Sequence, residues 1–178
     1  MTNAGAHQRF EQLMFPHLHA AYNLARWLVR NDEDARDIVQ EAYLRAYKYF
    51  TGFHGDNARV WLLAIARRTC YSGFERNRKD VFMVDIDAPL HTESVSEHVS
   101  YDTPETLFLQ HESAQMLNQA LDSLALEFRA VLVLRALEDL SYREIATVLD
   151  IPIGTVMSRL ARGRKLLELA LQRMRAEA

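Results

Sequence analysis

The stretch that decides the fold lies near the C-terminus, where residues 141–165 read SYREIATVLDIPIGTVMSRLARGRK. Ser141, followed three residues later by Glu144, has the pattern of a capping box, which predicts that a helix starts at this point. Residues 150–152 break that helix, and a second helix is predicted to begin near Gly154. Two short helices across a tight turn are typical of a helix-turn-helix.

The second helix of this pair is predicted to present a basic face to the outside. Val156 and Leu160 give it an apolar side that faces inward, and residues 153–178 contain six basic and two acidic side chains. Such a face suits the major groove of DNA, because Arg reaches guanine edges and Ser bonds to either base type. The alternative is a basic solvent-exposed face on a purely structural helix pair. The candidate DNA-binding residues are Thr155, Met157, Ser158, Arg159, Ala161, Arg162 and Lys165.

Charge is distributed unevenly along the chain. The formal net charge is −3, but residues 80–128 hold ten acidic side chains and no Lys or Arg. The other 129 residues therefore carry 21 basic and 14 acidic side chains, a balance of +7. Because two basic ends can contact phosphates while an acidic middle avoids them, the local charge is more informative than the total.

The acidic middle also predicts the domain organisation. Residues 85–104 contain two prolines and no sustained apolar period, which is typical of a linker. Neither flanking part shows the alternation of a strand, and the chain has only six glycines. We therefore expect an all-α fold of two small helical domains, residues 1–79 and 106–178, joined by an acidic flexible linker at 80–105.

Apolar residues at helical spacing predict three helices in the first domain. Pro16 is expected to start or kink the first of them, and Asp32 is expected to cap the second. The second helix should end near Gly52. A loop follows at residues 51–57, and the third helix is expected over about residues 58–79, with six basic side chains and one acidic.

Several classes of protein are excluded because their signatures are missing. The single cysteine, Cys70, rules out an intramolecular disulfide and a zinc site built from paired cysteines, and it is expected to be a small buried hydrophobe. The sequence has no glycine-rich phosphate loop, no Gly-x-Ser-x-Gly and no His-Glu-x-x-His, so we expect no enzyme, no cofactor and no metal. No apolar run approaches the roughly 20 residues of a membrane span, so we expect a cytoplasmic location without membrane contact.

The C-terminal motifs resemble those of a known family. Residues 140–146 (LSYREIA), 153–160 (IGTVMSRL) and 162–165 (RGRK) resemble the C-terminal promoter-binding domain of extracytoplasmic-function (ECF) sigma factors, a branch of the sigma-70 family. The resemblance implies a sigma-4-like domain over residues 106–178. The candidate residues on its basic helix would then read the minus-thirty-five element of a promoter.

The first half resembles the same family independently. Residues 34–47 are similar to the family's polymerase-binding helix, and residues 53–56 (FHGD) with 61–67 (WLLAIAR) are similar to its promoter-opening segment. The resemblance implies a sigma-2-like domain over residues 1–79. The residues expected to dock on the basic clamp coiled coil of RNA polymerase are Asp37, Gln40 and Glu41.

The same resemblance implies that the loop at 51–57 and the helix after it hold the non-template strand of the minus-ten element. Opening DNA requires a pocket that favours an unstacked base, with cations near the backbone phosphates. Trp61, at its spacing, is expected in the core rather than stacked on a base. The candidate residues are Phe53, His54, Asp56, Asn57, Arg59, Arg67 and Arg68.

Three positions depart from the family pattern. Arg68 stands where Asn is usual, which bears on the base preferred at the minus-ten element. Asp150 replaces a turn glycine, and because Asp tolerates the left-handed conformation, the turn is expected to survive. Gly163 stands at a common Ala position and is expected to loosen the recognition helix.

The resemblance implies three partners: core RNA polymerase, contacted at its clamp and flap, promoter DNA, and an anti-sigma factor. Two alternatives have to be weighed against a sigma factor. A helix-turn-helix regulator acting without polymerase would have no use for the helix at 34–47. A sigma mimic that only binds an anti-sigma protein would have no use for the basic recognition face.

Overall fold

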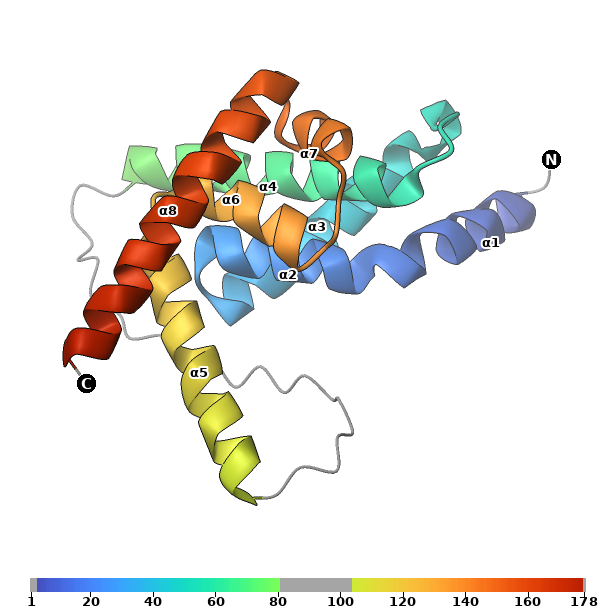
Figure 1. Ribbon diagram of the computed structural model, residues 1–178. Coiled ribbons are helices and arrows are strands. Elements are labelled where there is room, and N and C mark those ends of the chain that lie inside the picture. Colours follow the sequence, from blue (N-terminus) through green and yellow to red (C-terminus); the bar gives the residue numbers. More distant parts are fainter. Residues whose placement is uncertain (1–2, 81–103, 178) are drawn as a thin grey trace.

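The computed structural model describes residues 3–80 and 104–177, and these residues form α-helices and two short 3-10 helices, with no strand within these ranges (Figure 1). The all-α prediction is therefore confirmed. The linker predicted at 80–105 falls almost entirely on residues 81–103, which lie outside the described residues.

The N-terminal helices surround an apolar core. The largest side chains that are fully buried in it are Phe10, Met14, Leu24, Leu62 and Leu63. Helices α2, α3 and α4 contact one another, and α1 packs against α4. The elements are α1 (Asn3–Met14), η1 (Phe15–His17), α2 (Leu18–Val29), α3 (Asp32–Tyr49), η2 (Phe50–Gly52) and α4 (Ala58–Asp80).

The cap of α3 differs from the prediction. Helix α2 ends at Arg30, which has φ 59 and whose backbone N–H donates to the Arg26 carbonyl oxygen at 2.9 Å. Asn31 follows in an extended conformation, and its side-chain oxygen accepts a hydrogen bond from the Asp34 N–H at 2.9 Å. An N-cap must lie outside the helix for its side chain to reach back in this way. Asp32 is already helical and its carboxylate bonds to Arg26 instead, so the prediction that Asp32 is the cap is wrong.

The C-terminal helices carry the predicted helix-turn-helix. The capping box is confirmed, because the Ser141 side chain accepts from the Glu144 N–H at 3.2 Å and the Ser141 N–H donates to Glu144 Oε2 at 2.7 Å. Asp150 adopts the left-handed conformation, φ 55, at the end of the first helix, as expected. The elements are α5 (Pro104–Ser123), α6 (Leu126–Ala136), α7 (Tyr142–Leu149) and α8 (Ile153–Glu177).

Gly163 has a packing role that the sequence did not indicate. It is buried where α8 crosses α6, and a Cβ at this position would lie 3.3 Å from Leu132 Cδ1 and 3.4 Å from Phe128 Cβ. The glycine therefore allows the two helices to approach closely. Helix α8 continues through this position without interruption.

The two domains pack against each other. Helix α6 lies between α8 and the N-terminal α2, and α7 lies against α4 (Figure 1). The buried apolar side chains of both parts form one continuous cluster, from Phe10 and Leu24 to Leu134, Ile145 and Leu160. The described residues therefore adopt a closed arrangement, in which part of the predicted minus-ten surface faces the opposite domain.

Candidate functional site

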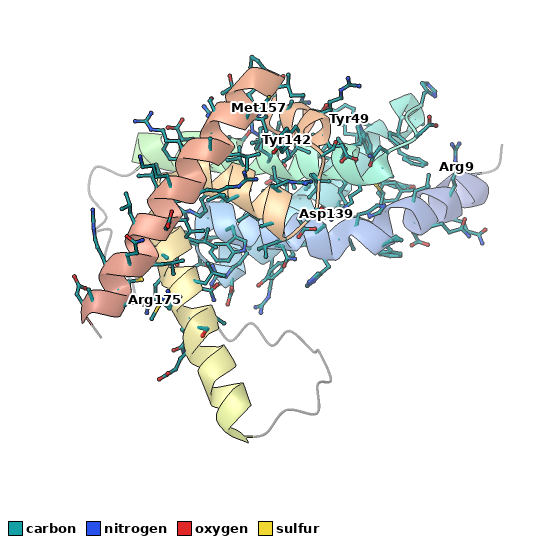
Figure 2. All side chains as sticks on the ribbon, viewed as in Figure 1. Arg9, Tyr49, Asp139, Tyr142, Met157 and Arg175 are labelled. Carbon is teal, nitrogen blue, oxygen red and sulfur yellow. The ribbon has the colours of Figure 1, made fainter. Side chains whose placement is uncertain are left out.

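The first turns of α8 present the predicted recognition face. Val156 and Leu160 are 0% and 1% exposed, so they pack inward as predicted. Met157 is 53% exposed and lies at the opposite end of α8 from Arg175 (Figure 2). Of the remaining candidates, Thr155 and Arg159 are half-buried. The exposed ones are Ser158, Ala161, Arg162 and Lys165. This face is formed by one continuous helix, so the candidates lie together.

Two arginines of this face have different surroundings. Arg159 forms an ion pair with Glu127 of α6 at 3.1 Å, which engages its guanidinium within the protein. Arg162 is exposed, and its guanidinium carbon lies 5.7 Å from the centre of the Phe128 ring, a cation–π contact. Arg162 is thus the arginine better placed to bond to a base edge, because a ring contact leaves its N–H groups available.

Glu144 holds the start of the helix-turn-helix electrostatically. Hydrogen bonds from the backbone N–H of Ser141, above all, lower the pKa of the Glu144 carboxyl, with smaller contributions from the Ser141 and Asn57 side chains and from Arg59. A carboxylate with a lowered pKa stabilises the folded state above its unfolded pKa of about 4.3, and this contribution is lost as the pH falls through the folded pKa.

Replacing Glu144 with Gln tests this role of the charge. Gln also completes a capping box, so the variant keeps the local geometry and loses the carboxylate. We expect the variant to melt at a lower temperature than the parent at pH 7, and we expect the difference to shrink toward zero near pH 3. Melting followed by circular dichroism at the two pH values measures it, and a difference that does not depend on pH would contradict the assignment.

The loop at 51–57 brings only part of the predicted minus-ten pocket together. His54 and Asp56 are exposed, whereas Phe53 is half-buried, with its ring centre 4.8 Å from that of Trp61. Trp61 is itself half-buried and packs against the core, as expected. Asn57 caps α4 by accepting from the Val60 N–H at 3.0 Å. Its amide also donates to Glu144 Oε1 of the other domain at 2.8 Å.

Arg59 lies apart from the other two basic candidates on α4. Arg59 is half-buried and paired with Glu138 of the C-terminal domain, at 2.6 Å. Arg67 stacks on the Tyr71 ring, with its guanidinium carbon 4.5 Å from the ring centre, and Arg68 is exposed. Arg67 lies about 12 Å along the helix from Arg59, at 1.5 Å per residue. In this closed arrangement the structure therefore does not bring the seven minus-ten candidates onto one open surface.

Helix α3 carries the predicted polymerase-binding residues on its outer side. Asp37 and Gln40 are exposed, and Glu41 is half-buried in an ion pair with Arg45 one turn later. Gln40 borders an apolar hollow of about 310 Å³ that the sequence did not reveal. The hollow is lined by Phe15, Leu18, Tyr22, Arg36, Val39, Gln40 and Tyr43.

The hollow was missed because its wall comes from two distant segments. Phe15 lies in η1 and Tyr43 in α3, yet their rings stack with centres 5.7 Å apart. Phe15 remains 53% exposed. An exposed aromatic ring beside an acidic helix suits a contact surface, and the sequence patterns singled out neither ring.

Other kinds of site find no support among residues 3–80 and 104–177. These ranges contain no group of three or more His, Cys, Asp or Glu side chains placed to bind a metal ion. None of their helices combines the length and the apolar character that a membrane span requires. Cys70 is buried, and burial raises the pKa of its thiol to about 12, so the thiolate form that reacts as a nucleophile is not populated at neutral pH.

Comparison with known families matches both ends of the chain. Sigma-70 region 2 matches residues 14–80, and Sigma-70 region 4 matches residues 114–167. RNA polymerase sigma-H factor of Pseudomonas aeruginosa is 32% identical over 177 residues, which cover 98% of this chain and 92% of that protein. ECF RNA polymerase sigma-E factor of Escherichia coli K12 is 33% identical over 171 residues, which cover 94% of this chain and 89% of that protein.

Solved structures share the fold. The sigma factor RpoE in complex with the anti-sigma factor NepR from Bartonella quintana matches with a TM-score of 0.72 and 24% identity, over 93% of this chain and 98% of that one. CnrH in complex with the cytosolic domain of CnrY matches with a TM-score of 0.63 and 23% identity, over 95% of this chain and 94% of that one. The resemblance in sequence is thus confirmed along nearly the whole chain, and the protein belongs to the extracytoplasmic-function branch of the sigma-70 family of RNA polymerase sigma factors.

Proposed function

We propose that this sigma factor directs core RNA polymerase to promoters through three separate surfaces and assists promoter opening. The outer face of α3 binds the polymerase. The loop at 51–57 with α4 binds the minus-ten element, and the first turns of α8 bind the minus-thirty-five element. The observation that carries this proposal is that one sigma-70 chain has an acidic helix, α3, in its first domain and a basic recognition helix, α8, in its second.

The recognition helix supports the minus-thirty-five assignment. Its buried positions Val156 and Leu160 fix which side faces the protein, so the exposed side chains between and after them are free to enter a groove. In a helix-turn-helix, the side chains that read base pairs lie on the first turns of the helix that enters the major groove. Ser158 and Arg162 meet that requirement by exposure and by chemistry.

The outer face of α3 supports the polymerase assignment. Asp37 is exposed beside the apolar hollow that Gln40 borders, so one surface offers both negative charge and a recess for an apolar side chain. A basic partner helix with a protruding apolar residue complements such a surface in both respects. The clamp coiled coil implied by the family resemblance is the partner that we assign to it, and the C-terminal domain is the part that we assign to the flap.

Control by an anti-sigma factor is part of the proposal. Both of these structural neighbours were solved with a partner chain, the anti-sigma factor NepR in one case and the cytosolic domain of CnrY in the other. We further propose that this protein acts in the cytoplasm, makes no membrane contact of its own, needs no cofactor and catalyses no reaction by itself.

Transcription in vitro tests the function directly. The purified chain is added to core RNA polymerase on a library of promoter fragments, and bound polymerase is measured by pull-down. We expect the chain to join the core enzyme and to select start sites that share minus-ten and minus-thirty-five sequences. Binding to DNA without the core enzyme would favour a helix-turn-helix regulator, whereas binding to an anti-sigma protein without transcription would favour a sigma mimic.

A further inference from the structure

The interface between the two domains contains a buried carboxylate. Glu138 follows α6 and is only 5% exposed. Its Oε2 accepts from Arg59 Nη2 at 2.6 Å and its Oε1 accepts from Asn23 Nδ2 at 3.0 Å. Both donors belong to the N-terminal domain, on α4 and α2. We call these three residues the Glu138 cluster.

Three further polar contacts join the two domains. Arg129 of α6 is 5% exposed and donates to the Trp27 carbonyl oxygen of α2 at 3.0 Å. Asp122 of α5 pairs with Arg30, at the end of α2, at 3.4 Å. The third contact is the hydrogen bond from Asn57 to Glu144 at 2.8 Å. Charged and amide groups thus join the domains at several points around the apolar contacts of α2 with α6 and α4 with α7.

Buried polar and charged groups at the interface stabilise the closed arrangement as long as each of them keeps its partner. A buried charge loses its hydration, and its partners must replace that loss. Removing one partner leaves the other buried and unpaired, which favours separation, because the charge is hydrated again once the domains part. Interfaces between domains of one chain are more polar than obligate interfaces, and relative motion of the domains is the default expectation.

The closed arrangement is incompatible with simultaneous contact to both promoter elements. The elements are separated by roughly 25 base pairs, or about 85 Å of B-form DNA at 3.4 Å per base pair. A compact chain of this length has a radius of gyration of only about 16 Å. The arrangement also engages Asn57 and Arg59, two of the minus-ten candidates, with Glu144 and Glu138.

We propose that the Glu138 cluster holds the free sigma factor closed and covers part of its minus-ten surface, so that separation of the domains precedes promoter binding. This inference rests on the proposed function for the assignment of Asn57 and Arg59 to DNA. The closure itself is independent of that assignment, because it follows from contacts within the chain. Glu138 acts through Arg59 and is not itself a DNA contact.

Small-angle X-ray scattering of the full-length free chain tests the closure. We expect Glu138→Lys to raise the radius of gyration by roughly 5 Å or more, because Lys faces Arg59 across the interface and the domains separate. Adding Arg59→Glu to that variant re-forms an ion pair of reversed polarity, and we expect it to restore the parent value. Helix content from circular dichroism reports that each variant is folded. A folded Glu138→Lys chain as compact as the parent would overturn the proposal.

A matched pair of milder variants tests the covering of the DNA surface. Glu138→Gln and Asp139→Asn each remove one negative charge at adjacent positions, but the Asp139 side chain is 94% exposed and pairs with Arg135 of its own domain. Figure 2 labels Asp139, which marks this segment. Asn also tolerates the φ of 49 at position 139.

The probe is a fluorescent single strand carrying a minus-ten sequence, with binding followed by anisotropy. We expect the Glu138→Gln chain to bind it several-fold more tightly than the Asp139→Asn chain, since a larger fraction of molecules is open. Equal affinities would overturn the covering of the surface. Because scattering uses neither DNA nor polymerase, a failure of the wild-type chain to support transcription would count against the proposed function and leave the closure standing.

Discussion

Reversing Asp37 and Glu41 to Lys is expected to abolish binding to core RNA polymerase while the chain stays folded. Both side chains lie on the outer side of α3, where surface substitutions usually change the free energy of unfolding by less than about 0.5 kcal/mol. Placing positive charge against a basic partner costs several kcal/mol, so we expect the affinity to fall by roughly 100-fold or more. Surface plasmon resonance with immobilised core enzyme measures the loss.

The two single reversals should reduce the affinity for core polymerase by different amounts. Arg45 already pairs with the Glu41 carboxylate, whereas Asp37 is exposed. We therefore expect Asp37→Lys to cause most of the loss. Reversing Glu168 and Glu177, two exposed acids on α8, produces the same change in net charge far from α3 and should reduce the affinity much less than the α3 reversal. Core binding that survives the Asp37 and Glu41 reversal would remove α3 as the docking surface.

The features that the sequence predicted correctly are those set by local periodicity. The capping box at Ser141 and the inward positions Val156 and Leu160 follow from spacings of three or four residues, which a helix turns into a common face. Asp150 could be predicted in the left-handed turn because its side chain tolerates that conformation. The cap of α3 could not be decided in the same way, since Asn31 and Asp32 both suit a cap and the backbone conformation selects between them.

The features that the sequence did not predict depend on partners far away in the chain. Arg59 was expected to be free for DNA, but its partner Glu138 lies 79 residues later. The ion pair of Arg159 with Glu127 likewise follows from the packing of α8 on α6, which no local pattern encodes. Charge counts indicate that a segment is basic. They do not indicate which of its cations are already paired, and that distinction decides which residues are available to DNA in the closed chain.

Arg162→Ala is expected to reduce discrimination at the minus-thirty-five element by about 1–3 kcal/mol, roughly 5- to 150-fold. Arg162 lies over the Phe128 ring, and no carboxylate among the described residues forms an ion pair with it. Its N–H groups therefore remain available for a guanine edge. The substitution also removes the cation–π contact, worth about 0.5–1 kcal/mol of stability at an exposed site. Discrimination is a ratio of affinities for two DNA sequences, so this loss of stability does not enter it.

Two further variants separate base reading from phosphate binding. Arg164→Ala removes the same charge from an exposed position on another side of α8, and we expect it to weaken binding to all sequences alike. Arg162→Lys keeps the charge but loses the bidentate fork, so we expect it to keep most of the affinity and to lose most of the discrimination. Competition binding by the holoenzyme on promoter fragments that differ only in the minus-thirty-five element gives both quantities. If Arg162→Ala and Arg164→Ala weaken all fragments equally, Arg162 contacts a phosphate, and the reading of bases must be assigned to other side chains of the same face, with Ser158 the first to test.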